Sequence, residues 1–300
     1  MSRVVIAGGS GFLGRSLIDA LDADVVVLSR QSAAVAGRAR VVQWTPDGTA
    51  GAWASALGGA DAVINLAGES IAARRWTMEQ KKRILDSRLQ ATRSLVAAIG
   101  LAPSPPAVFI SGSAVGYYGP LGDEAVTEDH VPGQDFLANV CVQWEAEAMR
   151  AAGSRTRVVC VRTGLVLERG GGALPKMLPP FWAGAGGPVG SGRQYWPWIH
   201  LRDWIGLVCF AIRTPTLSGP LNASAPNPVT NRDFARALGR ALHRPAFMPA
   251  PAFALKLLLG EMAGALLLSG QRVVPARAER LGFTFAFKDV DSALRSIFAQ

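Results

Sequence analysis

The chain has 300 residues and a formal net charge of +9 at pH 7, with 49% hydrophobic and 18% charged residues. This length and composition exclude a disulfide-stapled miniprotein and a wholly disordered chain, and at ~150 residues per domain they predict about two domains. Cys141, Cys160 and Cys209 lie far apart and form no CxxC pair, so we expect no disulfide framework, no metal site and a reducing compartment. Because the chain opens directly on an apolar strand, without a signal-peptide pattern, we expect a cytoplasmic protein.

Most basic residues are arginines, whose planar guanidinium groups suit phosphate oxygens. Dense basic runs are limited to residues 74–75 and 81–83, and no nucleic-acid-reading motif accompanies them. The charge is therefore compatible with a small phosphate-bearing ligand, and we expect no nucleic-acid partner. A solvated, arginine-rich surface is the alternative interpretation.

The first thirty residues predict a strand, a turn, a helix and a second strand. Residues 4–7 and 25–28 are apolar, residues 8–14 are rich in glycine, and residues 15–21 have helical character. This order is a βαβ unit. Further apolar strands, most of them separated by helical stretches, follow at 41–44, 62–66, 108–111 and 158–162. We therefore predict an α/β fold with a Rossmann-type, doubly wound parallel sheet.

The turn after the first strand carries glycines at three regularly spaced positions. The first glycine of such a strand–turn–helix allows a tight turn, the second lets the backbone approach a pyrophosphate, and the third lets the helix pack on the strand. The helix N-terminus then faces the phosphates. We predict dinucleotide binding here in preference to a plain structural turn. The expected contacts are Gly8, Ser10, Gly11, Phe12, Leu13 and Gly14.

The second strand ends at Ser29 and Arg30, the position that meets the adenosine ribose in dinucleotide-binding folds. An acidic residue there favours NAD, whereas a basic residue accommodates the 2′-phosphate of NADP. Arg30 therefore predicts NADP as the cofactor, with Ser29 and Arg30 as contacts. A solvated loop arginine is the alternative.

The later part of the chain differs from the first part in its pattern of predicted helices, strands and loops. A long helix is predicted over residues 77–99, and after about residue 165 glycine- and proline-rich loops surround a group of aromatic residues. We expect residues 1–165 to form an NADP-binding Rossmann domain, to which later segments return, and residues 166–300 to form a smaller substrate lobe and C-terminal region. The apolar positions between Leu255 and Leu266 are interrupted by charges and are too few for a membrane span. We expect them in the core, and no membrane partner.

Three further segments follow strands at the places where a cofactor and a substrate would lie. They are Asn-Leu-Ala-Gly at 65–68, Ile-Ser-Gly-Ser-Ala-Val-Gly-Tyr-Tyr-Gly at 110–119, and Trp-Ile-His-Leu-Arg-Asp at 198–203. With the glycine turn, they resemble the short-chain dehydrogenase/reductase superfamily, and in particular its extended members related to nucleotide-sugar epimerases. The resemblance implies that Leu66, Ala67, Gly68 and Val166 contact the cofactor. It also implies that Ser113 positions and polarises a substrate oxygen.

The resemblance breaks at the proton-transfer residues. Extended members use a tyrosine with a lysine four residues later, but in this chain, aligned on Trp144 and Glu145, Leu137 and Cys141 take those positions. Arg88 takes the place of a family asparagine. These departures resemble an atypical subgroup labelled "epimerase family protein", in which the substrate is not established. The C-terminal stretches 269–273 and 281–283 also resemble that subgroup.

Several side chains are candidates for the missing roles. Arg88 would supply the fixed positive charge of the lost lysine and bind the cofactor, unless it forms a surface ion pair. Tyr117 is the candidate proton donor and substrate contact nearest to Ser113, with packing as the alternative. Cys141 is a candidate nucleophile or redox thiol, although its apolar neighbours favour inert packing. Candidate substrate contacts in the second lobe, with structural roles as the alternative, are Arg193, Trp196 and His200.

Two functions remain open from the sequence. The first is an NADP-dependent oxidoreductase or epimerase that acts by hydride transfer on an unidentified small hydroxyl or carbonyl compound, with nucleotide-linked compounds among the candidates. The second is a non-catalytic NADP-binding sensor or regulator, which the missing tyrosine–lysine pair favours. The fold alone does not decide between them. The expected partners are a small-molecule substrate and, by analogy with extended members, a second copy in a homodimer.

Overall fold

The computed structural model describes residues 2–31 and 39–299. Its centre is a seven-stranded sheet in the order β11-β7-β5-β4-β1-β2-β3, in which all neighbouring strands are parallel. The strands are β1 (Arg3–Ala7), β2 (Asp24–Ser29), β3 (Arg40–Gln43), β4 (Ala62–Asn65), β5 (Val108–Ala114), β7 (Arg157–Thr163) and β11 (Gly219–Ala223). Because the strand order reverses between β1 and β4, this is the predicted α/β, doubly wound sheet, and the prediction is confirmed.

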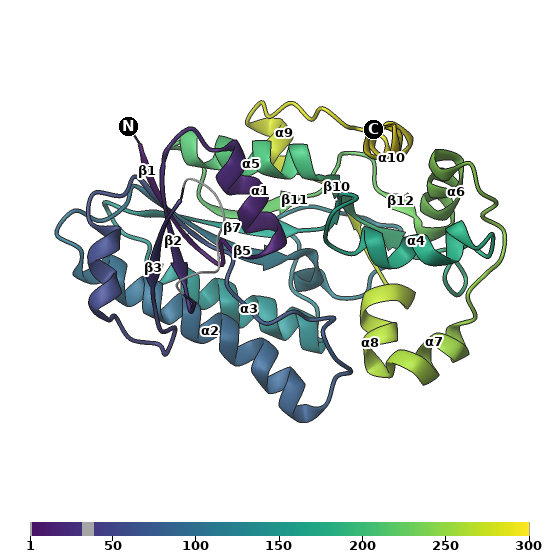
Figure 1. The fold of residues 1–300 in the computed structure, drawn as a ribbon, viewed down its shortest axis with the longest axis horizontal. Coiled ribbons are helices and arrows are strands. Elements are labelled where there is room, and N and C mark those ends of the chain that lie inside the picture. Colours follow the sequence, from purple (N-terminus) through teal and green to yellow (C-terminus); the bar gives the residue numbers. More distant parts are fainter. Residues whose placement is uncertain (1, 32–38, 300) are drawn as a thin grey trace.

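Helices cover both faces of the sheet (Figure 1). Helices α1 (Phe12–Ala20) and α5 (Leu201–Arg213) lie on one face, and α2 (Met78–Leu101) and α3 (Phe136–Met149) lie on the other. Successive residues of a buried strand point to opposite faces. On β1, accordingly, Ile6 belongs to the core under α1 and α5, whereas Val5 belongs to the core under α2.

The start of α2 agrees with the predicted helix over 77–99. Thr77 Oγ1 accepts a hydrogen bond from the backbone N–H of Gln80 at 3.1 Å. The Gln80 side chain is buried, and its Nε2 has no partner among the described residues. The threonine bond of a capping box is thus formed, and no return bond from the Thr77 backbone N–H to the Gln80 side chain is found among the described residues.

The second lobe consists of short paired strands and helices around its own core. The pairs are β8 (Leu165–Leu167) with β10 (Trp198–His200), β9 (Tyr195–Trp196) with β12 (Val229–Thr230), and β6 (Ala125–Val126) with β13 (Arg272–Val273). The helices are α4 (Leu174–Trp182), α6 (Asn231–Leu242), α7 (Ala252–Leu259), α8 (Glu261–Ala263) and α10 (Val290–Phe298). Helix α9 (Ala276–Arg280) packs instead against β11, and its Ala278 belongs to the core under α1 and α5. Shorter helical turns occupy Ala52–Leu57, Val115–Tyr118 and Gly264–Leu268. The core of this lobe includes Phe181, Trp196, Trp198 and Phe234.

Two expectations for this lobe are wrong. Pro179 and Pro180 do not mark a loop but lie inside α4, whose last turn is closed by the bond from Ala183 N to the Pro179 carbonyl. The apolar positions from Leu255 to Leu266 are not a core helix, because α7 has no buried residue and only Met262 and Ala263 among them are buried. Apart from Lys256, every side chain of α7 itself is apolar, so the periodicity of the sequence could not indicate which side of the helix, if any, is covered.

Candidate cofactor and substrate site

The glycine turn connects the carboxyl end of β1 to the N-terminus of α1. Gly8 has a φ of +83°, and a Cβ on it would lie 2.6 Å from the backbone carbonyl carbon of Leu66. A Cβ on Gly14 would lie 2.5 Å from the carbonyl oxygen of Gly8. Because both obstacles are backbone atoms, these two positions require glycine.

Gly11 differs, because a Cβ there would meet only the Gly8 carbonyl oxygen, at 3.3 Å. Gly11 begins α1 without any side-chain cap, and the Ser10 carbonyl is taken by Arg15 Nε at 2.7 Å. The first amides of α1, which include those of Phe12 and Leu13, therefore lie at a helix N-terminus with no capping side chain. The partial positive charge of this N-terminus favours an anion such as a phosphate.

A second glycine-rich segment closes over the turn. A Cβ on Gly171 would lie 2.1 Å from the Phe12 ring, and a Cβ on Gly172 would lie 3.3 Å from the carbonyl oxygen of Val166. Val166 itself is buried in β8. The structure thus brings Val166 and the Gly171–Gly172 backbone close to Phe12, so that both lobes meet at the start of α1.

Ser29 and Arg30 lie at the carboxyl end of β2, one strand away from the glycine turn. Ser29 is buried, and its hydroxyl accepts from the backbone N–H of Gln31 at 3.2 Å. Arg30 is exposed. A cation at this edge has the position that a 2′-phosphate requires.

The residues after β4 form the neighbouring wall. Leu66 N donates to the Ala7 carbonyl at 2.8 Å, and Ala67 N donates to Asn65 Oδ1 at 3.1 Å. Asn65 is itself held by a 2.9 Å bond to Thr92 on α2. These bonds fix the backbone that leads to Gly68 beside the turn.

Arg88 lies directly against Gly68. A Cβ on Gly68 would lie 3.2 Å from Arg88 Cγ, and the Arg88 guanidinium carbon lies 5.1 Å from the Trp144 ring centroid. Its Nη1 donates to the carbonyls of Ile84 and Glu69 at 2.9 and 3.0 Å. Burial lowers the pKa of Arg88, and within residues 2–31 and 39–299 no carboxylate forms an ion pair with it. An anionic ligand would supply the missing counter-charge.

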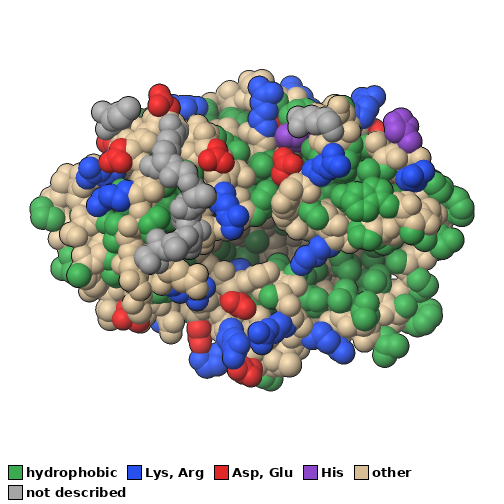
Figure 2. Space-filling model, in the orientation of Figure 1, with side chains coloured by type: hydrophobic (Ala, Val, Ile, Leu, Met, Phe, Trp, Pro, Cys, Tyr) green, Lys and Arg blue, Asp and Glu red, His purple; other side chains and the backbone are tan. Residues whose placement is uncertain are grey.

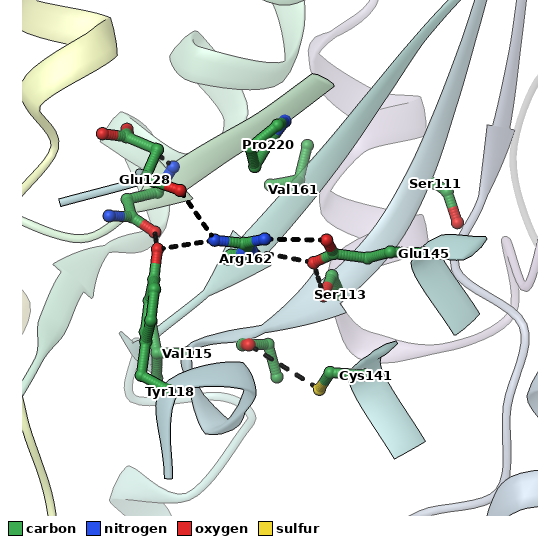
Figure 3. Close-up of polar contacts among 12 residues, drawn as sticks. Ser111, Ser113, Val115, Tyr118, Glu128, Cys141, Glu145, Val161, Arg162 and Pro220 are labelled. Carbon is green, nitrogen blue, oxygen red and sulfur yellow. Dashed lines mark hydrogen bonds and ion pairs between the residues drawn. The ribbon is translucent and has the colours of Figure 1, made fainter. Parts of the chain in front are cut away.

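Ser113 near the end of β5 faces a buried ion pair (Figure 3). Its hydroxyl donates to Glu145 Oε1 at 2.6 Å. Arg162 on β7 donates to both carboxylate oxygens of Glu145 at 2.8 Å. Burial opposes the positive charge of Arg162, but the bonds and charge of Glu145 more than offset it and raise the pKa of the guanidinium. Both charges are therefore held in place beside Ser113.

The same guanidinium engages both tyrosines that follow Ser113. Arg162 Nη1 donates to Tyr118 Oη at 2.9 Å, and Tyr118 donates to Asn222 Oδ1 at 2.6 Å. Burial raises the pKa of Tyr118 to about 12. The Arg162 guanidinium carbon lies 3.4 Å from the Tyr117 ring centroid. The Tyr118 hydroxyl is thus fully occupied inside the protein, whereas Tyr117 is only half-buried.

This network continues to the C-terminal region. Glu128 Oε1 accepts from Asn222 N at 3.0 Å, and the Glu128 carboxylate also accepts from Arg277 N, the nearer oxygen at 3.2 Å. Burial raises the pKa of Glu128. Gln271 Nε2 donates to the carbonyl of Val115, just before the two tyrosines, at 2.5 Å. The C-terminal region therefore holds the loop that follows β5.

Cys141 and Leu137 lie on α3, near the loop after β5. The Cys141 thiol contacts the Ala114 carbonyl at 3.7 Å. Burial raises the pKa of Cys141 to about 11, so the thiol is protonated at neutral pH and a poor nucleophile. Leu137 Cβ lies 3.3 Å from the Cβ position of Gly116. These surroundings favour packing roles for both residues.

The three candidate substrate contacts differ in how far the second lobe encloses and holds their side chains. Arg193 is exposed, and its backbone N–H donates to Ser191 Oγ. Trp196 is buried, and its Nε1 has no partner in the described part of the chain. His200 Nδ1 accepts from Arg202 N at 3.0 Å and caps α5, and its ring stacks on another aromatic ring. Both His200 nitrogens are engaged, because Nε2 also contacts a serine hydroxyl.

Sequence reasoning missed Glu145 and Arg162 as site residues. In the sequence, Glu145 was used only to align α3 with the family pattern, and Arg162 was recognised only as the last residue of a predicted strand. The available signal was an arginine at the end of the apolar run 158–162, because an arginine on a central strand requires a buried anionic partner.

The space-filling view shows the surface hollowed between the two lobes (Figure 2). In residues 2–31 and 39–299, no group of three or more potential metal ligands comes together. No helix described in the structure is long and apolar enough to cross a membrane.

Comparisons with known proteins agree with this geometry. The model of the NAD dependent epimerase/dehydratase family matches residues 4–222, and a domain of unknown function, DUF1731, matches residues 250–297. The chain is 42% identical to the epimerase family protein SDR39U1 of Bos taurus, over 99% of this chain and 100% of that protein. It is 38% identical to the epimerase family protein YfhF of Bacillus subtilis, over 99% and 98%. The crystal structure of human SDR39U1 with NADPH has a TM-score of 0.91 at 38% identity and covers 99% of both chains.

Proposed function

Because the chain belongs to the NAD dependent epimerase/dehydratase family, we propose that it binds NADP(H) at the glycine turn. We further propose that it acts as an oxidoreductase or epimerase on a small hydroxyl or carbonyl compound. The observation that carries the proposal is that the uncapped α1 N-terminus and Ser113 lie at the same edge of the sheet, at the carboxyl ends of β1 and β5, with only β4 between them. Ligands bind at this edge in doubly wound sheets.

The residues present fit NADP(H). Gly11 leaves space above the N-terminus of α1 that a larger side chain would fill, and Arg30 supplies a cation at the end of β2. Arg88 adds a partly buried cation that has no carboxylate partner in the described ranges. The human relative was crystallised with NADPH, which supports the same cofactor here.

When bound, NADP(H) supplies the hydride acceptor or donor. The chain's own residues then orient the substrate oxygen. Ser113 donates its hydroxyl hydrogen bond to Glu145 and presents its oxygen lone pairs to a ligand hydroxyl. Tyr117 is the phenol available for proton exchange, because the Tyr118 hydroxyl is bonded on both sides within the protein.

The proposed function also assigns a role to each part of the chain. In this proposal residues 1–165, with β11 and α5, bind the cofactor. The later residues supply the substrate lobe with Arg193, Trp196 and His200.

A specific observation favours the second candidate function, an NADP(H)-binding sensor without turnover. Leu137 and Cys141 replace the tyrosine and lysine that extended members use, and Cys141 is buried and protonated. Cofactor occupancy would then order the hollow between the lobes for a partner to recognise.

One experiment separates these functions. Calorimetric titration with NADPH and with NADH should show tighter binding of NADPH, and Arg30→Ala should remove the preference. The exposed Arg40→Ala on the next strand is the matched control. A screen for hydride turnover over sugar nucleotides and small carbonyl compounds follows on the same sample. Turnover would establish an enzyme, tight binding without turnover would favour the sensor, and tighter binding of NADH would contradict the cofactor assignment.

A further inference from the structure

Helix α7 is an apolar helix that the protein does not cover. Its sequence is Ala-Phe-Ala-Leu-Lys-Leu-Leu-Leu, and none of its residues is buried. Phe253, Leu257 and Leu258 are 75%, 79% and 69% exposed. Burying a large apolar side chain that is exposed to water lowers the free energy. Binding of another molecule or surface over α7 would therefore be favourable.

The exposed apolar surface extends beyond α7. Phe247 and Met248 are also exposed, as is Trp182 at the end of α4. The segments are adjacent, because Met248 N donates to the Gly186 carbonyl at 3.0 Å and the Gly187 and Met248 backbones touch. Figure 2 shows the gathered hydrophobic side chains at the α4 and α7 end of the molecule. We call the following set the α7 face: Trp182, Phe247, Met248, Phe253, Leu257 and Leu258.

The other exposed large hydrophobic residues do not gather in this way. They are Met78, Leu101, Val131, Val142 and Met149, which lie on α2, on α3 and in the loop before α3. Of the eleven large hydrophobic side chains that are exposed in residues 2–31 and 39–299, six thus belong to the α7 face. A contiguous exposed patch of this kind marks an interaction surface in soluble proteins.

The charges at the edge of the α7 face are positive. Between residues 244 and 260 the only charged side chains are Arg244 and Lys256. Arg75 lies against the end of α7, with its Nη2 3.2 Å from the Cβ position of Gly260. The nearby Glu261 is neutralised by an ion pair with Lys81. The face therefore combines an apolar centre with a cationic edge, on a chain whose net charge is +9.

We propose that the α7 face docks on the surface of a lipid bilayer that contains anionic lipids. The apolar side chains would enter the boundary between headgroups and acyl chains, and the cationic edge would meet the anionic headgroups. Trp182 suits this boundary, since tryptophan concentrates there. A second copy of the chain is the poorer occupant, because two cationic edges would then face each other. The sequence led us to expect no membrane partner of any kind, and the finding that no described helix could cross a membrane agrees with that expectation as far as spanning is concerned. Surface binding by the α7 face would depart from it.

Vesicle flotation of the full chain tests the proposal. We expect binding to phosphatidylcholine vesicles that also contain phosphatidylglycerol, weaker binding to phosphatidylcholine alone, and loss of binding as salt increases. Leu257→Glu and Phe253→Glu should each reduce vesicle binding by about tenfold or more, and Lys256→Glu should reduce it less. The matched control is Leu101→Glu, at an equally exposed leucine at the far end of α2, which should bind like the unaltered chain.

Three outcomes would overturn the proposal. One is the absence of binding to either vesicle type. Another is binding that Leu257→Glu leaves unchanged, which would assign the attraction to the net charge of the whole chain. The third is a dimer in sedimentation velocity that Leu257→Glu converts to a monomer, which would assign the face to contact between copies. Thermal melts of each variant verify that the fold is retained.

Discussion

Ser113 donates its hydroxyl proton to Glu145 Oε1 at 2.6 Å, at the point where the family resemblance expects a serine to polarise a substrate oxygen. A hydroxyl can donate one hydrogen bond, and here a buried carboxylate accepts it. The Ser113 oxygen is therefore an acceptor toward a ligand. A substrate hydroxyl satisfies this arrangement better than a carbonyl, which has no proton to give.

Removing the Glu145 carboxylate should strongly destabilise the protein. In Glu145→Ala the Arg162 charge loses its ion-pair partner, and breaking a buried pair on one side costs about 3–5 kcal/mol. Urea unfolding measures the change in free energy. The matched control is Glu147→Ala on the same helix, whose partners Arg93 and Arg150 are exposed, so that it should cost about 2 kcal/mol or less. Equal losses in the two variants would contradict the role assigned to the buried pair.

The sheet and the glycine turn could be predicted because their signals are local. Each apolar run, such as 25–28 or 62–66, is itself a strand or nearly so. The turn at Gly8 to Gly14 is recognisable because strand, glycines and helix follow one another within one segment. For these elements, the tertiary contacts in the structure agree with the secondary structure that the local sequence already favours.

The network around Arg162 could not be predicted, because it depends on contacts between distant segments. Glu145 is on α3, Tyr118 follows β5, and Asn222 is on β11, more than a hundred residues after Tyr118 in sequence. Nothing in their spacing indicates that they meet. The exposure of α7 is equally non-local, since an apolar segment is buried or exposed according to what the rest of the chain places beside it.

Alanine at Gly11 should separate cofactor binding from folding. A Cβ there would meet only one atom, at 3.3 Å, so the free energy of unfolding should change by about 1 kcal/mol or less. The same Cβ would fill the space over the helix N-terminus, and NADPH binding should weaken by about tenfold or more.

Two further glycine variants provide the comparison. Gly14→Ala places Cβ 2.5 Å from the Gly8 carbonyl oxygen and should destabilise the fold by about 1–3 kcal/mol. Gly100→Ala in α2, with open space around its Cβ, should leave NADPH binding unchanged and raise the free energy of unfolding by up to about 1 kcal/mol. Calorimetry with NADPH and urea unfolding measure the two quantities. Normal NADPH binding by Gly11→Ala would argue against a phosphate over this turn.

Removing the Arg88 guanidinium should weaken cofactor binding. A charge-assisted hydrogen bond contributes about 1.5–3 kcal/mol, so Arg88→Ala should raise the Kd for NADPH by about tenfold or more. The control is Arg83→Ala on the same helix, which is exposed and paired with Glu79, and which should change the Kd by less than about twofold. Calorimetric titration of the unaltered chain and of the two variants with NADPH measures the three Kd values. An unchanged Kd in Arg88→Ala would restrict this arginine to its contacts with Glu69 and Trp144.

His200 should make stability depend on pH. Burial lowers the pKa of His200 below its ordinary value of 6.5, so below pH 6.5 the unfolded chain binds a proton more readily than the folded chain. The free energy of unfolding should therefore fall as the pH falls through this region. Protonation also removes the acceptor at Nδ1 that holds Arg202 N.

The variant His200→Asn isolates this contribution, because asparagine can cap α5 without titrating. Urea unfolding at several pH values on both sides of 6.5 should show a smaller loss of stability on acidification than in the unaltered chain. The exposed His243→Asn, at the end of α6 where φ is +53°, is the control, because asparagine tolerates that conformation. If His200→Asn lost stability with acid as steeply as the unaltered chain, the dependence would have to come from other groups.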